Sequence, residues 1–212
     1  MKDIIIVCAG SLGKEIYTII NAINRQCEKQ GKLVPYKILG FIDDNPYALE
    51  KSNMNASVIG SISDWKPIGN EVYAIGASGK IKYEIAKKLK IKGCRFETLI
   101  APWSLVSSDC TMGEGCFITA YSISAGVKLG DFVNVLGSML CPGTQIGDYS
   151  TTTGFTVVDN ATIGKNVFVG SHAVVSNGVC IGDNAKISAG SIVYENIKAG
   201  ATVFGVPAVE IA

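Results

Sequence analysis

A glycine-rich turn near the start of the chain is the first group of residues that could do chemistry. The apolar run 4–8 leads into this turn, and a stretch with helical apolar spacing, residues 14–25, follows it. A strand, a tight turn and a helix in this order can hold a phosphate, because backbone N–H groups and the helix N-terminus point at the ligand. Cys8 replaces the first glycine of the usual Gly-x-Gly-x-x-Gly pattern, so a purely structural turn is the alternative. The candidate binding residues are Gly10, Ser11, Leu12 and Gly13.

The next two apolar runs also lead to candidate binding residues. The run 37–45 ends in two carboxylates, and the run 72–75 is followed by small residues. Carboxylates at the C-terminal end of a parallel strand accept hydrogen bonds from ribose hydroxyls or from a base. Because parallel strands end at one edge of a sheet, we expect these residues and the glycine-rich turn to line one phosphate or sugar pocket. A solvated turn is the alternative for the carboxylates. The residues concerned are Asp43, Asp44, Ala77 and Ser78.

His172 is the only histidine of the chain. Imidazole suits general base catalysis because its pKa lies near neutral pH. A lone histidine in a repetitive segment is, however, more often a corner or surface residue. With one histidine and seven cysteines that form no CxxC pair, we expect no metal site. The cysteines are expected to be reduced thiols of a cytoplasmic protein.

A fixed sequence period runs through the second half of the chain. Five times an apolar residue is followed by glycine, at intervals of 17, 17, 17 and 18 residues. Within a period, apolar residues recur every six residues, which fits short strands separated by corners rather than a helix or a flat strand. The pattern predicts a solenoid of about five coils with three strands per coil. The motifs begin at Met112, Leu129, Ile146, Ile163 and Ile181.

Composition and charge exclude some classes of function and divide the chain. The net charge is +1, so no general affinity for nucleic acid or anionic membranes is expected. No signal peptide and no membrane-spanning apolar stretch is recognisable, which favours a cytoplasmic location. Residues 1–100 carry 15 Lys/Arg and 10 Asp/Glu, a net charge of +5, whereas residues 101–212 carry 4 and 8, a net charge of −4. We therefore predict two domains, residues 1–100 and 101–212.

Strands and helices alternate over residues 1–100. Apolar runs typical of buried strands occur at residues 4–8, 37–45, 72–75 and 96–100, and helical spacing occurs at 14–25 and 80–90. This alternation predicts a small Rossmann-like α/β domain with three layers.

The repeats resemble those of the hexapeptide-repeat acyltransferases. The resemblance rests on Ile146-Gly147-Asp148, Ile163-Gly164-Lys165-Asn166, Ile181-Gly182-Asp183-Asn184 and the closing Gly205-Val206-Pro207-Ala208. It implies that residues 101–212 form a left-handed parallel β-helix, an exception to the usual right-handed crossover.

Motifs in the first 100 residues narrow the resemblance to sugar O- and N-acetyltransferases of sialic-acid and bacterial surface-glycan biosynthesis. This resemblance implies an N-terminal domain that binds a nucleotide-sugar or sugar acceptor and a β-helix that binds acetyl-CoA as the acyl donor. It also implies a homotrimer with active sites between subunits. The motifs are Ala9-Gly10-Ser11-Leu12-Gly13-Lys14-Glu15, Gly40-Phe41-Ile42-Asp43-Asp44-Asn45-Pro46, Ala74-Ile75-Gly76 and Leu99-Ile100-Ala101-Pro102.

The same resemblance implies an acetyl-CoA site made of small residues, which let a ligand approach the backbone closely. Ordinary coil corners are the alternative. Apolar residues that recur along the coils agree with the implied homotrimer, because large apolar patches mark interfaces. The implied CoA-binding positions are Gly154, Gly170, Ala189, Gly190, Gly205, Val206, Pro207 and Ala208, and the recurring apolar residues include Phe117, Phe132, Phe155, Phe168 and Val174.

The family's catalytic base is missing from the matching stretch. In the family a histidine lies four or five residues before an Ile-Gly repeat, in a stretch that opens with asparagine. Asn134 is present here, but the histidine position falls on Cys141 or Pro142, and Thr151 stands at a second family histidine. Cys141 could replace the base as a thiolate, with an inert buried thiol as the alternative. His172 is the other candidate.

Two functions from different classes remain open. The first is an acetyl-CoA-dependent acyltransferase that acts on a nucleotide-linked sugar with a non-standard base or mainly by positioning. The second is a catalytically inactive trimer that binds a ligand or has a structural role on the same scaffold. The sequence does not identify the acceptor sugar or decide between O- and N-acylation.

Overall fold

Parallel β-structure dominates the chain. The computed structural model describes all 212 residues, which form two helices and 24 strands. The chain divides into two compact units: residues Met1–Ala77 with Ile81–Pro102, and residues Ser78–Lys80 with Trp103–Ala212. The elements of the first 100 residues are β1 (Lys2–Val7), α1 (Ser11–Lys29), β2 (Tyr36–Ile42), β3 (Val58–Gly60), β4 (Val72–Ile75), α2 (Gly79–Ile91), β5 (Arg95–Phe96) and β6 (Leu99–Ile100).

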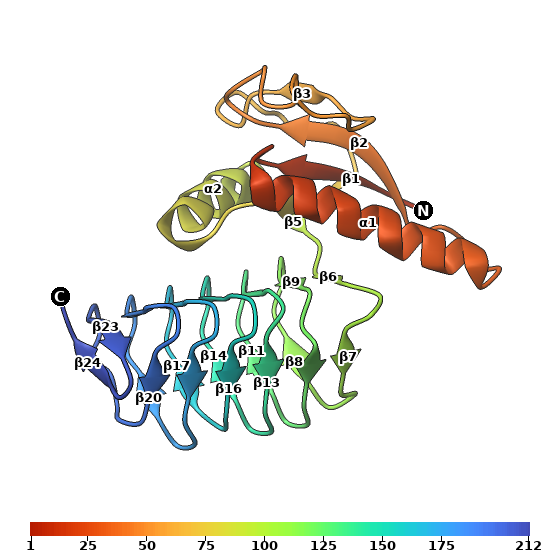
Figure 1. Ribbon diagram of the computed structural model, residues 1–212. Helices are drawn as coiled ribbons and strands as arrows, with labels where there is room; N and C mark the ends of the chain where they lie inside the picture. The colour runs from red at the N-terminus through yellow and green to blue at the C-terminus, as the bar shows by residue number, and fades with distance from the viewer. The chain divides into compact units, whose positions relative to one another are not determined.

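The first unit is built on a parallel sheet with the strand order β3-β2-β1-β4-β5 (Figure 1). β1 lies in the middle because its residues Ile4–Val7 are apolar and fully buried, as a strand covered on both faces must be. Val7, the last residue of β1, pairs with Ile42 of β2 and Ile75 of β4. The three strands therefore end side by side, and the chain segments that follow them leave from one edge of the sheet.

Helix α1 lies along one face of this sheet (Figure 1). Ile16, Ile19 and Ile20 are buried, and their spacing places them on one stripe of the helix. The helix begins after Gly10, which caps it without a side-chain hydrogen bond, and Gly31 takes a φ of +66° just after its end. No helix of the structure is long and apolar enough to cross a membrane.

A buried hydrogen-bond network holds the irregular connection between β3 and β4. The Tyr73 hydroxyl donates to the Glu71 carboxylate, and the Trp65 Nε1–H donates to the Tyr73 hydroxyl at 3.0 Å. The Ile68 N–H also donates to the Glu71 carboxylate, at 2.7 Å. The Trp65 ring packs so closely over Gly60 that no Cβ would fit there. The network therefore ties the connection to β3 and to β4 without a helix.

The prediction of a Rossmann-like three-layer α/β domain is wrong. Such a domain places helices at its strand crossovers on both faces of the sheet, whereas the whole chain has only α1 and α2. The connections from β2 to β3 and from β3 to β4 contain no helix. The reason is that residues 46–71 lack an apolar stripe with helical spacing and are held by polar contacts instead. The chain is mostly β-structure with two helices.

The second unit is a parallel β-helix whose strands form three sheets, named here the β12, β13 and β14 faces. The β12 face contains β9 (Phe117–Ile118), β12 (Asn134–Val135), β15 (Thr151–Thr152), β18 (Phe168–Val169), β21 (Lys186–Ile187), β23 (Thr202–Gly205) and the antiparallel β24 (Ala208–Glu210). The β13 face contains β7 (Leu105–Val106), β10 (Ser122–Ile123), β13 (Met139–Leu140), β16 (Val157–Val158), β19 (Val174–Val175) and β22 (Ile192–Val193). The β14 face contains β8 (Thr111–Met112), β11 (Lys128–Leu129), β14 (Gln145–Ile146), β17 (Thr162–Ile163) and β20 (Cys180–Ile181).

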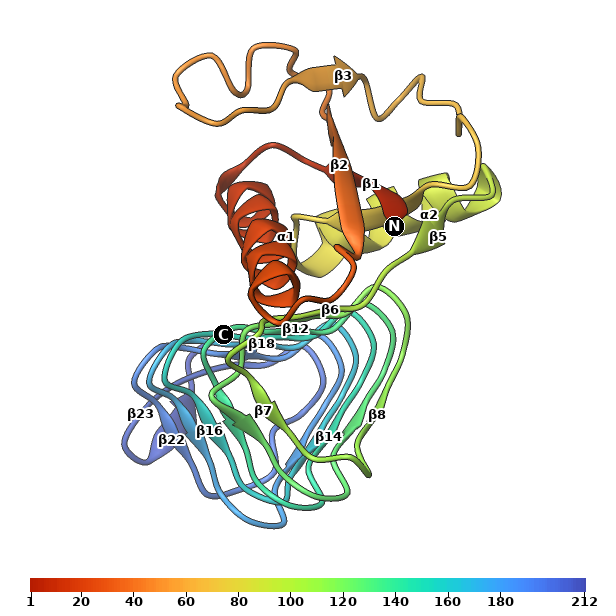
Figure 2. The same cartoon turned by 90° about the vertical axis from the view of Figure 1, so that its right-hand side faces the viewer.

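Successive coils overlie one another, so the unit is a three-sided prism when viewed along its axis (Figure 2). Each short strand pairs with its equivalent one coil further on, as Leu140 pairs with Val158 and Ile146 with Ile163. The second residue of each strand points inward, and the stacked Val, Ile and Leu side chains fill the core. The structure is consistent with the predicted left-handed β-helix.

In three of the five repeats the aspartate after the glycine binds the neighbouring coil. Asp131 Oδ1 accepts the Glu114 N–H at 3.1 Å, and Asp148 Oδ1 accepts the Asp131 N–H at 3.0 Å. Asp183 Oδ1 accepts the Lys165 N–H at 2.7 Å, while the Lys165 ammonium lies 2.9 Å from Asp148 Oδ2. The repeat therefore carries an acid at this position because its carboxylate satisfies a backbone donor at the corner.

Candidate functional site

The glycine-rich turn after β1 is closed by Asp43, which follows β2. The Ala9 N–H donates to Asp43 Oδ2 at 2.7 Å, and the Asn45 N–H donates to Asp43 Oδ1 at 2.8 Å. The structure thus brings the turn and this carboxylate together at the edge where β1 and β2 end. Because Asp43 already uses the Ala9 N–H, that donor is not free for a phosphate.

The two glycines of the turn have different surroundings. Gly13 is buried, and a Cβ there would overlap the Cys8 carbonyl oxygen. A Cβ on Gly76 would overlap the backbone of Gly13, so these two glycines let α1 approach the ends of β1 and β4. Gly10 is exposed, a Cβ added to it would meet no atom within 4 Å, and Ser11 is also exposed. Gly13 is therefore a packing residue, and Gly10 and Ser11 are the accessible part of the turn.

Asp44 is held by the segment that follows β3. Its Oδ1 accepts the Ser61 hydroxyl at 2.5 Å and both the N–H and the hydroxyl of Ser63 at 3.0 Å. The Ser61 hydrogen bond, followed by those of Ser63, lowers the pKa of Asp44 from 3.8 to about 2. This carboxylate is therefore ionised at every physiological pH, and its second oxygen is available as an acceptor.

The field at this edge of the sheet is negative. Burial, and after it the charges of Asp43 and Asp44, raise the pKa of the Cys8 thiol from 9.0 to about 12. Cys8 has a φ of +71°, and its carbonyl oxygen lies against Gly13. A negative field and occupied N–H donors disfavour a phosphate and favour hydroxyl or ammonium groups. Ala77 and Ser78 follow β4, with Ala77 half-buried and Ser78 exposed.

Four of the predicted CoA-binding residues lie in one column where the chain turns from the β12 face to the β13 face. This glycine corner consists of Gly137, Gly154, Phe155, Gly170, Ser171, His172, Ala189 and Gly190. Backbone hydrogen bonds stack the column: the His172 N–H donates to the Gly154 carbonyl, and the Gly190 N–H donates to the Ser171 carbonyl, each at 2.9 Å. A Cβ on Gly170 would meet the backbone of Ala189 at 2.6 Å, so its lack of a side chain is required by the next coil.

The other four predicted CoA-binding residues extend the column at the C-terminal end of the prism. Gly205, Val206, Pro207 and Ala208 connect β23 to the antiparallel β24. The Gly205 N–H lies 3.3 Å from the Ser191 hydroxyl, one residue after the glycine corner. A surface pocket of about 270 Å³ borders this hairpin, lined by residues 195–198, Val203 and residues 208–210. The eight positions thus follow one edge of the β-helix.

His172 is an exposed member of the glycine corner with a φ of +61°. Its ring stacks on Phe155, with the ring centroids 5.0 Å apart. No carboxylate or carbonyl accepts a hydrogen bond from its imidazole. A general base normally has such a partner to fix its tautomer and orientation, so this environment argues for packing rather than for proton transfer.

Cys141 lies at a different corner, where the chain turns from the β13 face to the β14 face. Burial raises the pKa of its thiol, and the charge of Asp159 and a hydrogen bond between the two side chains raise it further. A catalytic cysteine needs a lowered pKa, because the thiolate is the reactive form. The Cys141 thiol is therefore a hydrogen-bond donor and not a base or nucleophile. Asp159, which the sequence reasoning missed, is the ionisable partner at this corner.

Asn134 is fully buried in β12, and its Nδ2 lies 3.4 Å from the Thr151 hydroxyl. Its coil runs from the β12 face through the glycine corner and the β13 face before it reaches Cys141. The three candidate catalytic residues therefore belong to three different places: Asn134 to the β12 face, His172 to the glycine corner and Cys141 to the far side of the β13 face. Within one chain they form no catalytic group. No three His, Cys, Asp or Glu side chains lie close enough together to hold a metal ion.

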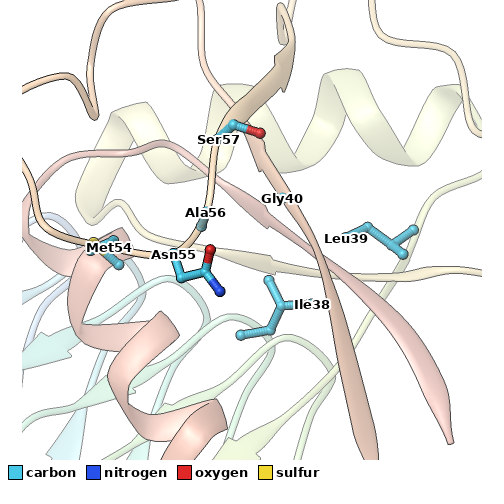
Figure 3. Close-up of a pocket in the computed structure, with 7 residues that line it drawn as sticks. All are labelled: Ile38, Leu39, Gly40, Met54, Asn55, Ala56 and Ser57. Atoms are coloured by element: carbon cyan, nitrogen blue, oxygen red, sulfur yellow. The ribbon is translucent and has the colours of Figure 1, made fainter.

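A second surface pocket, which the sequence did not predict, adjoins the free edge of β2 (Figure 3). β3 pairs with β2 only from Phe41 onward, so the edge before it has no strand partner there. The side chains of Ile38 and Asn55 approach each other in this pocket, whereas Leu39 points away (Figure 3). Its volume is about 420 Å³, it contains no acidic, basic or thiol side chain, and its one hydroxyl, that of Ser57, has no base among the lining residues. It is therefore unsuited to acid–base or covalent chemistry. Its lining residues are Ile38, Leu39, Gly40, Met54, Asn55, Ala56 and Ser57.

Comparison with known proteins supports the repeat assignment. The family model described as "Hexapeptide repeat of succinyl-transferase" matches residues 160–195. A search of curated proteins gave no match. Hexapeptide repeats, predicted from the 17- and 18-residue intervals, are thus confirmed for this segment.

Several solved structures share the fold over the full length of the chain. The acetyltransferase domain of PglB from Neisseria gonorrhoeae FA1090 has a TM-score of 0.80 at 19% identity, and all of both chains is covered. That domain has also been solved with acetyl coenzyme A. WeeI from Acinetobacter baumannii AYE has a TM-score of 0.77 at 21% identity, again with 100% of both chains covered. A mutant of GDP-perosamine N-acetyltransferase from Caulobacter crescentus, solved with CoA and GDP-perosamine, has a TM-score of 0.72 at 19% identity and covers 100% of this chain and 98% of its own.

Proposed function

We propose that the protein transfers an acetyl group from acetyl-CoA to a sugar, most readily a nucleotide-linked one. The observation that carries this proposal is the column of small residues at the glycine corner, on a fold shared with an acetyltransferase domain and with a GDP-perosamine N-acetyltransferase. Residues 1–100 are proposed to hold the acceptor and residues 101–212 the acyl donor. One fold can host many functions, so the fold alone does not establish this activity. The proposal therefore depends on the glycine corner, and the test is made at that corner.

The glycine corner suits the pantetheine arm of acetyl-CoA. An extended chain can lie along the corner only where side chains are short, and Gly154, Ala189 and Gly190 provide such places beside the stacked rings of Phe155 and His172. The column continues through Gly205 to Ala208, beside the pocket at the C-terminal hairpin. Successive coils lie about 4.8 Å apart along the axis of the prism. Because the column spans several coils, it is long enough for an extended acyl-CoA arm.

The acceptor is proposed to bind at the sheet edge where Gly10 and Ser11 are accessible and Asp43 and Asp44 lie. The charges of Asp43 and Asp44, which add to the effect of burial on the pKa of Cys8, favour ligand groups that donate hydrogen bonds. Ribose hydroxyls, sugar hydroxyls and a sugar ammonium are such groups, whereas the phosphates of a nucleotide-sugar would lie away from the carboxylates. This assigns the edge to the nucleoside or sugar portion of the acceptor.

The β13 face is proposed to form the interface of a homotrimer. Five of its six outward residues are apolar, the sixth being Ser122 of β10, while the outward residues of the β14 face are polar. A large apolar surface marks an interface. A threefold ring is closed by a head-to-tail contact, which suits a flat face bounded by two different corners. The β13 face presents Leu105, Met139, Val157, Val174 and Ile192, and the β14 face presents Thr111, Lys128, Gln145, Thr162 and Cys180.

Calorimetry with acetyl-CoA tests the donor site. A side chain on Gly154 would meet no atom within 4 Å, so Gly154→Trp fills the glycine corner and leaves the fold intact. We expect this variant to lose at least tenfold in affinity for acetyl-CoA. The matched control is Thr162→Trp on the polar β14 face, which should bind like the wild type. Equal binding by Gly154→Trp and the wild type would contradict the proposed site.

A catalytically inactive binding trimer is the second candidate function. Two observations favour it: the Cys141 thiol has a raised pKa, and nothing orients the His172 ring as a base. The decisive assay mixes the protein with acetyl-CoA and a panel of UDP- and GDP-linked amino sugars, and follows release of the CoA thiol and the mass of the product. Turnover supports the transferase. Binding of both ligands without turnover supports the inactive trimer.

A further inference from the structure

Acetyl transfer to a hydroxyl or amine needs a group that accepts a proton, and four of the five aspartates of residues 101–212 are engaged elsewhere. Asp131, Asp148 and Asp183 accept backbone N–H groups of the adjacent coil. Asp109 accepts the Ser107 hydroxyl at 2.7 Å and the Gly126 N–H at 3.0 Å. These carboxylates have structural roles at the corners.

Asp159 differs from them. Its carboxylate accepts no backbone N–H and pairs with no Lys or Arg, and its one side-chain partner is the Cys141 thiol. The two residues are neighbours in register: Leu140 pairs with Val158, and the Cys141 N–H donates to the Val158 carbonyl at 2.9 Å. Both follow a strand of the β13 face directly, and both are half-buried. The protonated thiol can therefore orient one carboxylate oxygen and leave the other free.

The place of Asp159 at the margin of the β13 face connects it to the donor site. This face is bounded by the glycine corner on one side and by the corner of Cys141 and Asp159 on the other. When three prisms enclose a threefold axis with their β13 faces inward, the glycine corner of each copy meets the Asp159 corner of the next. A thioester held at one copy's glycine corner then lies against the neighbouring copy's Asp159.

We infer that Asp159 is the general base of the reaction and acts on acetyl-CoA held at the glycine corner of the neighbouring copy, with Cys141 as its positioning residue. This inference rests on the proposed function. The acceptor nitrogen or oxygen forms a bond to the thioester carbonyl carbon, and the carbon–sulfur bond breaks. The acceptor proton moves to the carboxylate and then to the departing thiolate, which leaves as CoA-SH. No other reactant is required, and the base is regenerated.

Steady-state kinetics of matched variants test the base. Asp159→Asn should lower kcat about 100-fold or more, with the affinity for acetyl-CoA unchanged in calorimetry. Cys141→Ser keeps a donor beside the carboxylate and should retain most of the kcat, whereas Cys141→Ala should lose several-fold in kcat at constant KM. The control Asp109→Asn removes a structural carboxylate on the same side of the prism and should leave kcat within twofold of the wild type.

Co-expression of two inactive variants tests whether the base comes from the neighbouring copy. Asp159→Asn keeps the glycine corner, and Gly154→Trp keeps Asp159. In randomly mixed trimers about a quarter of the interfaces combine an intact corner with an intact Asp159, so about a quarter of the wild-type activity should return. If both residues serve the site of their own chain, no activity returns and the assignment to the neighbouring copy is overturned.

The outcomes separate this inference from the proposed function. Turnover by Asp159→Asn at the wild-type rate overturns the base and leaves the transferase proposal intact. A wild type that binds acetyl-CoA and an amino sugar without releasing CoA overturns both. A drop in kcat for Asp159→Asn with equal drops for Asp109→Asn means general damage to the β-helix and overturns the specific role.

Discussion

The imidazole of His172 stacks on the phenyl ring of Phe155, with centroids 5.0 Å apart and planes inclined by 28°. Phe155 in turn lies against Tyr121, with centroids 5.7 Å apart. The three rings form an exposed column along the glycine corner. Because the imidazole is held by a ring and by no hydrogen-bond acceptor, the only histidine of the chain contributes packing to the corner.

Replacement of His172 therefore separates packing from catalysis. His172→Ala should lower the free energy of unfolding by about 1 kcal/mol, since an aromatic pair of this kind is lost. Its kcat, and the pH dependence of kcat, should match the wild type. Urea unfolding and a pH–rate profile measure the two quantities. A large loss of kcat together with a changed pH profile would make His172 the base and refute its assignment to packing.

The β-helix was predictable because each coil repeats the same physical requirement. The residue Ile146 stacks on Ile163 in the next coil, so the spacing of apolar residues in the sequence is the spacing of the coils. The acid after the glycine was also part of the pattern, because Asp131 and Asp148 satisfy backbone donors at equivalent corners. A period in the sequence therefore identified a period in the structure.

The irregular connection between β3 and β4 and the pairing of Cys141 with Asp159 could not be predicted from local sequence patterns. The connection through Trp65 and Tyr73 is held by a side-chain network with no periodicity, and the predicted Rossmann-like domain, which has helices at its crossovers, is wrong there. The pairing of Cys141 with Asp159 depends on the length of the coil between them, which is a residue longer than the usual 17. The sequence resemblance identifies only Cys141, because Asp159 becomes its neighbour through the register of the coils.

The Tyr73 hydroxyl should be important for stability. Its loss in Tyr73→Phe leaves the Trp65 Nε1–H without a partner and removes one of the donors to the buried Glu71 carboxylate, which keeps the Ile68 N–H. We expect the free energy of unfolding to fall by about 2 kcal/mol, the usual effect of unsatisfied buried polar groups. Urea denaturation measures this. Tyr47→Phe is the matched control, because the Tyr47 ring is exposed and its hydroxyl makes no hydrogen bond; an equal effect in both variants would contradict the role of the network.

The two glycines of the turn after β1 should respond differently to alanine. In Gly13→Ala the added methyl overlaps the Cys8 carbonyl, so the packing of α1 must shift at a cost of about 1–3 kcal/mol. In Gly10→Ala the methyl has open space, and the change in stability should stay below about 1 kcal/mol. Thermal or urea unfolding of the two variants measures the two changes in stability. Gly13→Ala as stable as the wild type would show that the turn can open without strain.

Asp44 should make the first unit sensitive to acid. Its pKa is lowered from 3.8 to about 2 by the hydrogen bonds from Ser61 and Ser63. A lowered pKa in the folded state means that the stabilisation is fully present above the ordinary pKa and is lost as the pH falls toward about 2. The wild type should therefore be more stable than Asp44→Asn above pH 3.8, and the difference in stability should shrink as the pH falls from 3.8 to about 2. A difference that does not depend on pH would show that the ionised form is not preferred in the folded protein. Because the carboxylate is exposed, the difference will be modest.

The apolar β13 face should be required for assembly. Met139 lies at its centre and is 45% exposed in the single chain, so a charge at this position would be buried against a neighbour. We expect the wild type to sediment at three times the 22.3 kDa chain mass and Met139→Glu to sediment as a monomer. Thr162→Glu on the β14 face is the control and should remain a trimer. A wild type of 22.3 kDa in solution would refute the interface, and with it the meeting of the glycine corner with the neighbouring copy's Asp159.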